Sequence, residues 1–341
     1  MKILLILFTG RGGIQLYISQ LANALAKGDN EVTVLVAEHL FKEEYYSNPN
    51  VNVIYIDAPR SFFGMILRTI NPLTYYKLLR TINSLNPDVI HVIQEFLWLI
   101  ILFPFLRGYP RILTVHDPTF RGQGIRIYTK IEFIFRPFIR SMADRIIVHG
   151  EVLKKVLINK KIPENKVVSI PHGEFSLYSK WGNDACREYK SVLFFGTISD
   201  YKGIEYLIES EPTITKEVPG VKITIAGSGD FTKYERLINN RDNFEIDNRF
   251  IPDEEVAGLF QKASVVVLPY TGASQSGVVP IAYAFKKPVV VTNVGSIPEV
   301  VEHGKTGYVV PPKDSGALAD AIIKLLQNDD LRKEMGENAY E

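Results

Sequence analysis

The sequence predicts an α/β protein with two doubly wound domains, and three observations predict it. Strand-like and helix-like segments alternate along the chain, which is typical of a parallel sheet covered by helices. The alternation pauses once, over the polar, turn-forming residues 174–190, and then restarts. The 341 residues suffice for two domains of roughly 150 each. We therefore expect Rossmann-like domains at 1–173 and 191–341, joined by a linker at 174–190 and facing a central crevice at the strands' carboxyl ends.

The individual elements follow from hydrophobic period and turn residues. The expected strands of the first half are Lys2–Phe8, Glu31–Ala37, Val51–Ile56, Val89–Ile93, Arg111–Val115 and Arg145–His149. Its expected helices are Ile14–Ala26, Met65–Asn83, Arg126–Met142 and Glu151–Asn159. The expected strands of the second half are Ser191–Phe195, Val221–Ala226, Phe244–Ile246, Val265–Leu268 and Pro288–Thr292. Its expected helices are Gly203–Ser210, Asp230–Asn239, Asp253–Lys262 with Asp253 as N-cap, Val278–Phe285 and one from Ser315.

Composition excludes several classes of protein. A net charge of +1 gives no argument for nucleic-acid binding, and the single Cys186 excludes an internal disulfide framework. The apolar run Ile3–Phe8 ends in glycines and an arginine instead of a cleavage site, so we expect a buried strand. The stretch Phe96–Leu106 is too short to span a bilayer. We expect a cytoplasmic protein, with peripheral association at the inner face of the membrane as an open possibility.

That possibility comes from an uneven charge distribution. From Arg60 to Lys155 there are 14 Lys/Arg against 6 Asp/Glu. Aromatic residues are interleaved: Phe62, Phe63, Tyr75, Tyr76, Phe120, Tyr128, Phe133, Phe135 and Phe138. Two interpretations stay open. The helices simply expose solvated basic faces, or they form an interfacial surface for anionic lipid or a lipid-linked acceptor.

The most informative segment is 273–299, followed by 303–312. The small-residue loop Ala273–Gly277 leads into a short helix and a strand, and then into the turn Gly295–Glu299. Backbone N–H groups and the positive end of a helix dipole favour an anionic ligand in such a place. The segment resembles the donor-binding region of retaining glycosyltransferases of family 4, which are two-domain GT-B enzymes.

The resemblance implies roles for further residues. Lys202, in the strand–loop segment 196–203, would neutralise the leaving diphosphate. Thr197 stands where the family commonly has an arginine, and Arg11 and Arg249 are candidates to offset that charge. The implied catalytic residues are His116, Lys202 and Glu299. The implied donor contacts are Gly12, Gly13, Gly196, Thr197, Arg249, Phe250, Gln275, Ser276, Gly277 and Val278, and the acceptor-side residues are Arg11 and Asp117.

His116 follows a predicted strand and resembles the family's active-site histidine. It would hydrogen-bond the transferred sugar and support developing charge, with Asp117 orienting its imidazole. An isolated histidine is otherwise more often structural, and we favour a structural hinge role for His172. For Phe250, packing on the nucleotide base and burial in the core are equally open. The loop 9–15 lacks the third glycine of a dinucleotide fingerprint, which argues against a nicotinamide cofactor.

One departure from the family matters. It usually carries two glutamates eight positions apart, where this chain has Ala273 and Ile281. Gln275 and Ser276 can serve instead as the donor loop, the donor can be a deoxynucleotide sugar such as a dTDP-sugar, or the site can be degenerate.

The resemblance as a whole implies a retaining, hexosyltransferase-type enzyme of polysaccharide biosynthesis, in cell-envelope or glycolipid assembly. It would move a sugar from a nucleotide-sugar to a glycan or lipid-linked acceptor, with no metal, no other cofactor and no nucleic acid. The alternatives are a GT-B epimerase or phosphorylase, and a degenerate scaffold subunit. The family's final crossover helix is expected to be missing from the sequence up to Glu341.

Overall fold

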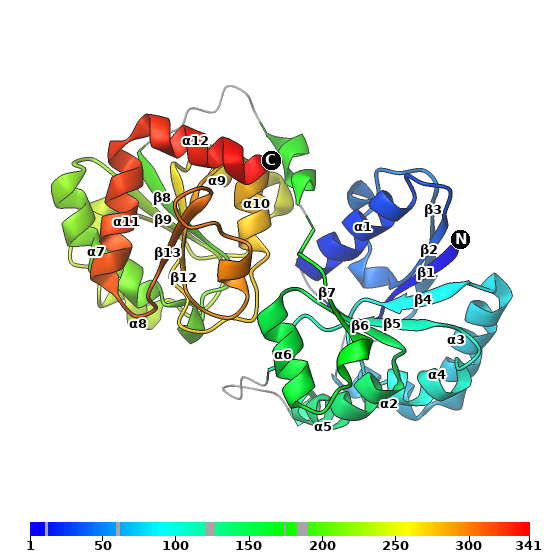
Figure 1. Ribbon diagram of the computed structural model, residues 1–341. Coiled ribbons are helices and arrows are strands. Elements are labelled where there is room, and N and C mark those ends of the chain that lie inside the picture. Colours follow the sequence, from blue (N-terminus) through cyan, green and yellow to red (C-terminus); the bar gives the residue numbers. More distant parts are fainter. Residues whose placement is uncertain (11–12, 59–61, 120–126, 174, 183–189) are drawn as a thin grey trace. The chain divides into compact units, whose positions relative to one another are not determined.

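The computed structural model describes residues 1–10, 13–58, 62–119, 127–173, 175–182 and 190–341. They form two compact units, residues 1–173 and 174–341. Each unit holds one parallel β-sheet with helices packed on it, as Figure 1 shows for each unit separately. The expected fold class, two doubly wound Rossmann-like α/β domains, is confirmed.

Unit 1 has a seven-stranded sheet in the order β3-β2-β1-β4-β5-β6-β7. Its strands are β1 (Lys2–Leu7), β2 (Glu31–Ala37), β3 (Val51–Ile56), β4 (Val89–Val92), β5 (Arg111–Thr114), β6 (Arg145–Val148) and β7 (Val167–Ser169). The strand order reverses between β1 and β4, which makes their carboxyl ends the switch point of this sheet. The short edge strand β7 was not predicted, because three residues show no clear period.

The α-helices of unit 1 are α1 (Gly13–Leu25), α2 (Phe62–Ile70), α3 (Pro72–Leu85), α4 (Leu99–Phe105), α5 (Ile127–Met142) and α6 (Glu151–Asn159). Short 3₁₀ helices are η1 (Glu38–Leu40), η2 (Glu43–Tyr45) and η3 (Glu164–Lys166). The single helix predicted over residues 65–83 is wrong, because α2 and α3 divide it. Asn71 caps α3 by accepting a hydrogen bond from the Leu73 backbone N–H at 3.0 Å, and Pro72 occupies the first turn.

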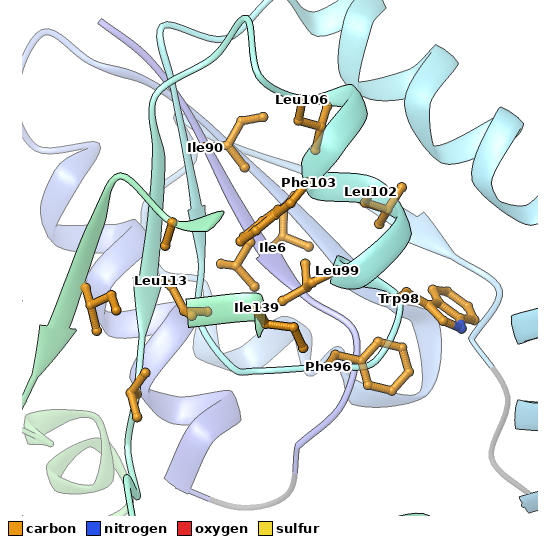
Figure 2. Packing of buried hydrophobic residues seen from close by; sticks show 14 of the residues in the cluster. Ile6, Ile90, Phe96, Trp98, Leu99, Leu102, Phe103, Leu106, Leu113 and Ile139 are labelled. Carbon is orange, nitrogen blue, oxygen red and sulfur yellow. The ribbon is translucent and has the colours of Figure 1, made fainter. Parts of the chain in front are cut away.

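The core of unit 1 explains the apolar stretch 96–106. Leu4 and Ile6 of β1 belong to one buried cluster. Leu99, Leu102 and Phe103 of α4 pack into the same cluster, close to Ile6 (Figure 2). Burying a side chain of this size stabilises the fold by about 1.5–3 kcal/mol. These residues are therefore apolar because they are core residues. Among the described residues, none of the helices is long and apolar enough to cross a bilayer.

Unit 2 has a six-stranded sheet in the order β10-β9-β8-β11-β12-β13, with its switch point between β8 and β11. Its strands are β8 (Ser191–Phe195), β9 (Lys222–Ala226), β10 (Phe244–Asp247), β11 (Val265–Leu268), β12 (Val289–Thr292) and β13 (Gly307–Val310). Its α-helices are α7 (Ile204–Glu217), α8 (Thr232–Glu235), α9 (Asp253–Lys262), α10 (Val278–Ala284), α11 (Ser315–Gln327) and α12 (Asp329–Tyr340). Its 3₁₀ helices are η4 (Ser176–Trp181), η5 (Asp200–Lys202), η6 (Arg241–Asn243) and η7 (Ile297–Glu299).

Several local predictions for unit 2 were wrong. The helix expected over 230–239 is the single turn α8, and α7 continues through Pro212 to Glu217. Asp253 is not the N-cap of α9; Pro252 precedes the helix, and the Asp253 carboxylate accepts a hydrogen bond from Tyr178 at 3.4 Å. That tertiary contact competes with the local cap. Tyr178 belongs to η4, which packs against α9 and α10 within unit 2.

Candidate functional site

Two strand-end loops meet at the switch point of unit 2. Gly203 has φ +63°, and a Cβ placed there would lie 2.0 Å from the carbonyl oxygen of Pro269. Only glycine therefore lets η5 lie against the chain after β11. The Thr271 N–H also donates to the Tyr201 carbonyl at 2.8 Å. The loop that carries Lys202 is thus fixed beside Tyr270.

Tyr270, which the sequence analysis missed, connects Lys202 and Ser276, two residues that the sequence analysis identified. The Lys202 Nζ lies 3.7 Å from the centroid of the Tyr270 ring. Tyr270 is fully buried, and its hydroxyl lies 3.4 Å from Ser276 Oγ. Ser276 Oγ in turn accepts a hydrogen bond from the Val278 N–H at 3.2 Å. An aromatic residue just beyond the end of β11, at the switch point, was the available signal for Tyr270.

Glu299 lies on a turn that is anchored to the same loop. Gly295 has φ +56°, and a Cβ there would lie 1.9 Å from the Ala273 carbonyl oxygen. The Ser296 N–H donates to the Ser274 carbonyl at 2.9 Å. Glu299 ends η7 and is exposed. The backbone therefore holds the Glu299 turn against the 273–277 loop.

The loop after β8 lies next to the first turn of α10. A Cβ on Gly196 would lie 4.0 Å from Val278 Cγ2, so the β8 loop neighbours the first turn of α10. Thr197, at the position where the resemblance leads to the expectation of an arginine, is exposed. The helix α10 spans seven residues, so its macrodipole is small. Lys202 contributes an ammonium group beside this loop.

The two positions without glutamate are core positions. Ala273 is 7% exposed and Ile281 is 5% exposed. Ile281 lies on α10 and packs into unit 2, so it offers no hydrogen bond to a ligand. Gln275, Ser276 and Gly277 are half-buried on the neighbouring loop.

Arg249 is a weaker substitute for the missing arginine than the sequence suggested. Its guanidinium donates hydrogen bonds to Asp247 at 2.8 Å and to Glu255 at 3.0 Å. The hydrogen bonds to Glu255, which has the larger effect, and to Asp247 raise the pKa of Arg249, and the two carboxylates compensate its charge. Phe250 is 68% exposed, so burial in the core is excluded for it.

The carboxyl edge of the unit 1 sheet carries a histidine–tyrosine cluster, which consists of Tyr17, His91, His116, His149 and His172. The Tyr17 ring lies 5.1 Å from His116, 5.1 Å from His149 and 5.4 Å from His172, measured between ring centroids. His116 Nε2–H donates to the Ile93 carbonyl at 3.1 Å. His149 had no assigned role in the sequence, and His172 was given a hinge role. Parallel strands β5, β6 and β7 bring them to one edge.

The cluster is held in its neutral form. Burial first, and then the neighbouring histidines, lower the pKa of His116 to about 3 and the pKa values of His91 and His149 to about 4. The low pKa keeps the His116 imidazole neutral at physiological pH, so it can take part in hydrogen bonds without carrying a charge. Across the described parts of the chain, no group of three His, Cys, Asp or Glu side chains has the arrangement of a metal site.

The other residues expected at this edge are only partly described. The Asp117 carboxylate accepts hydrogen bonds from the Thr119 N–H at 2.9 Å and hydroxyl at 2.6 Å. Gly13 starts α1, and a Cβ there would meet open space. Arg11 and Gly12 lie outside the described residues.

Two family models together cover most of the chain. Residues 11–173 match Glycosyltransferase Family 4, and residues 189–328 match Glycosyl transferases group 1. The phosphatidyl-myo-inositol mannosyltransferase of Mycobacterium tuberculosis is 26% identical over 339 residues, which cover 94% of this chain and 86% of the relative. The alpha-D-kanosaminyltransferase of Streptomyces kanamyceticus is 32% identical over 152 residues, 43% of this chain and 39% of that enzyme.

Solved structures share the fold of both units. Sucrose-phosphate synthase of Thermosynechococcus elongatus aligns with a TM-score of 0.74 at 21% identity, over 99% of this chain and 93% of the other. HepE of Anabaena, solved with UDP-glucose, aligns with a TM-score of 0.73 at 18% identity, over 100% of this chain and 93% of the HepE chain. A putative UDP-N-acetylglucosamine 2-epimerase of Listeria monocytogenes aligns with a TM-score of 0.67 at 15% identity, over 99% of this chain and 92% of the other. The fold alone therefore does not separate a transferase from an epimerase.

The fold and the loops at its strand ends define a GT-B protein. With the two family matches added, the chain belongs to the GT-B glycosyltransferases, with a Family 4 match in unit 1 and a group 1 match in unit 2.

Proposed function

We propose that this protein transfers a sugar from a nucleoside-diphosphate sugar to a glycan or lipid-linked acceptor. The observation that carries the proposal is the placement of Lys202 beside Tyr270 and the Ser276 loop, within the unit that matches group 1 transferases. An ammonium group next to a loop of backbone N–H donors suits a diphosphate. The names of the aligned relatives, a mannosyltransferase and a kanosaminyltransferase, support the same class of reaction.

The residues have distinct roles in this proposal. Lys202 neutralises the negative charge that grows on the leaving diphosphate as the glycosidic bond breaks. Gln275, Ser276 and the backbone at Gly277 replace the absent glutamates as donor contacts, and Glu299 contributes from the adjoining turn. His116, held neutral, hydrogen-bonds the transferred sugar.

We propose that the reaction retains the anomeric configuration and needs no metal. A retaining glycosidase uses two carboxylates about 5–5.5 Å apart, one of them as the nucleophile. Ala273 and Ile281 supply no carboxylate for such a scheme. Attack from the face that the diphosphate leaves, with the diphosphate oxygen accepting the acceptor's proton, avoids that requirement. An NMR spectrum of the product's anomeric proton, and full activity in a chelator, would test these two points.

The buried Ile281 prompts a narrower proposal for the donor nucleotide. A deoxynucleotide lacks the 2′-hydroxyl for which a glutamate is otherwise needed, so a dTDP-sugar suits this loop. Tighter binding of UDP-sugars than of dTDP-sugars, measured by calorimetry, would rule it out.

For the acceptor side we propose contact with an anionic lipid bilayer at the inner face of the membrane. The helices α2, α3, α4 and α5 lie in a row along unit 1. Their exposed apolar side chains include Ile66, Leu67, Ile70, Leu73, Tyr76, Ile101, Phe105, Ile134, Phe135 and Phe138. Exposed Lys77, Arg80 and Arg107 accompany them and complement anionic headgroups. We name this set the apolar helix face.

This face is less basic than the sequence count indicated. Arg136 and Arg140 point to the buried Glu95, and Arg68 forms an ion pair with Asp57. Tyr75, one of the interleaved aromatics, is a core residue. Insertion of apolar side chains therefore contributes more to the proposed membrane contact than charge does.

The first experiment is a thermal-shift screen against UDP, GDP, dTDP, ADP, CMP and their sugar conjugates. A ligand that binds only the folded state raises Tm by mass action. A selective shift, followed by turnover with an acceptor, supports the transferase. Selective binding without turnover on any acceptor favours the scaffold alternative. The Lys202→Ala variant should lose the shift, and Lys233→Ala is its control, because Lys233 also lies over a tyrosine but pairs with Asp200.

A further inference from the structure

We propose that Tyr270 is a positioning residue, which holds the Lys202 ammonium in place for the donor diphosphate and couples it to the Ser276 loop. The inference rests on the proposed function. It adds a residue to which the sequence analysis assigned no role. It also gives a physical reason why a tyrosine, and not another buried residue, follows β11.

The ring face of Tyr270 is well placed to hold a cation. A distance of 3.7 Å from the Lys202 Nζ to the ring centroid is well inside the range of about 6 Å for cation–π attraction. Tyr270 is 0% exposed, so water does not compete for the ring. The neighbouring Tyr201 lies farther from the same Nζ, at 5.2 Å, and is 39% exposed. Tyr270 is therefore the stronger of the two aromatic anchors.

An aromatic anchor differs from a carboxylate in one important respect. A ring quadrupole attracts an ammonium group without cancelling its charge. Arg249 and Lys233 are bound to carboxylates, which compensate their charges. A lysine that is ordered by a ring meets part of its ordering cost before the ligand binds.

The other end of Tyr270 reaches the donor loop. Its hydroxyl lies 3.4 Å from Ser276 Oγ, which also accepts the hydrogen bond from the Val278 N–H. Burial raises the pKa of Tyr270, so the phenol stays protonated at physiological pH. The lysine, the ring and the loop that starts α10 therefore form one connected series. A shift of the ring would displace both the cation and the loop.

Three variants separate the two functions of the side chain. Tyr270→Phe keeps the ring face and removes the hydroxyl, while Tyr270→Leu removes the face and keeps an apolar group. Tyr270→Met serves in place of the leucine variant if that one does not fold. We expect the phenylalanine variant to bind nucleoside diphosphate within about threefold of wild type, and the leucine variant to lose about tenfold in kcat/KM, mainly in kcat. In a protein that already carries Lys202→Ala, the Tyr270→Leu substitution should cause no further loss of kcat/KM.

The matched control is Tyr308→Leu. Tyr308 lies in β13, is 7% exposed and also carries a lysine over its ring, with Lys324 Nζ 4.8 Å from the centroid. It therefore reports what losing a buried tyrosine costs in general. Equal kinetics for Tyr270→Leu and Tyr270→Phe, or a full effect of Tyr270→Leu in the Lys202→Ala background, would overturn the proposal.

A second measurement needs no nucleotide. Lysines labelled by reductive ¹³C-methylation report their surroundings by NMR, and the Lys202→Arg variant identifies the Lys202 signal. The ring current of Tyr270 should shift that signal upfield in the wild type and in Tyr270→Phe, and Tyr270→Leu should abolish the shift. An unshifted wild-type signal refutes the positioning role. If the shift is present but no nucleotide binds, the proposed function fails and the geometry stands.

Discussion

Arg140 donates two hydrogen bonds to Glu95, from Nε to Oε1 at 2.6 Å and from Nη2 to Oε2 at 2.9 Å. The Arg140 side chain is 3% exposed and that of Glu95 is 7% exposed. Arg136 Nε lies 3.6 Å from the same carboxylate. The pair joins α5 to the chain just after β4, so it fixes the apolar helix face to the sheet.

Removing one partner of this pair should be strongly destabilising. We expect Glu95→Ala to lower the free energy of unfolding by about 3–5 kcal/mol, because it leaves the Arg140 charge buried without its carboxylate. Chemical denaturation measures the loss. The double variant Glu95→Met with Arg140→Met should regain part of it, since two apolar groups replace two charges. A single variant as stable as wild type would contradict this account.

The histidine–tyrosine cluster should make the protein sensitive to mild acid. The folded-state pKa values of His91 and His149, about 4, lie below the unfolded value of 6.5. The unfolded state therefore binds more protons as pH falls below 6.5, and stability falls until the folded pKa values are reached. At pH 5 each of these histidines lowers the free energy of unfolding by up to about 2 kcal/mol.

The measurement is Tm from pH 8 to pH 5. The variant His149→Asn should lose less stability over this interval than wild type. Parallel profiles for wild type and His149→Asn would show that the cluster does not titrate as described.

The glycine at 203 should be irreplaceable for a steric reason. A Cβ would lie 2.0 Å from the Pro269 carbonyl oxygen, and φ +63° is unfavourable for alanine. We expect Gly203→Ala to lower Tm by several degrees and to abolish nucleotide binding, because the Lys202 loop must move away from Tyr270. Gly258→Ala is the control: it lies in α9 with no atom near the new methyl group, and should be neutral or stabilising by about 0.5–1 kcal/mol. Unchanged nucleotide affinity in Gly203→Ala would contradict the steric argument.

The apolar helix face should bind vesicles. Ile70 is 71% exposed and Leu73 is 61% exposed, so the double variant Ile70→Ser with Leu73→Ser should fold normally. We expect it to sediment about tenfold less with anionic phosphatidylglycerol vesicles, because the apolar insertion is lost. Leu237→Ser changes an exposed leucine of unit 2 and is the control. Equal binding of wild type to neutral phosphatidylcholine vesicles would remove the role of Lys77 and Arg80, and no binding to either would refute the membrane contact.

Local sequence pattern determined much of the fold. The strands Glu31–Ala37 and Val51–Ile56 and the helix Glu151–Asn159 have the predicted bounds, because their apolar period and turn residues are local properties. The loop 196–203, which carries Lys202 between two glycines, could likewise be recognised from its local sequence. The division into α2 and α3 at Asn71 was missed because the apolar period runs through it, although the Asn-Pro cap was visible.

What only the tertiary structure decided is which strand ends meet. Tyr270 lies beside Lys202 because β11 pairs with β8, across more than sixty residues of sequence. Likewise, His116, His149 and His172 lie around Tyr17 because β5, β6 and β7 are neighbours. Glu95 binds Arg140 because α5 packs next to α4. Hydrophobic period specifies which face of an element is buried, but not which partner buries it. Strand order and packing supply that partner, and with it the surroundings of every buried charge and ring.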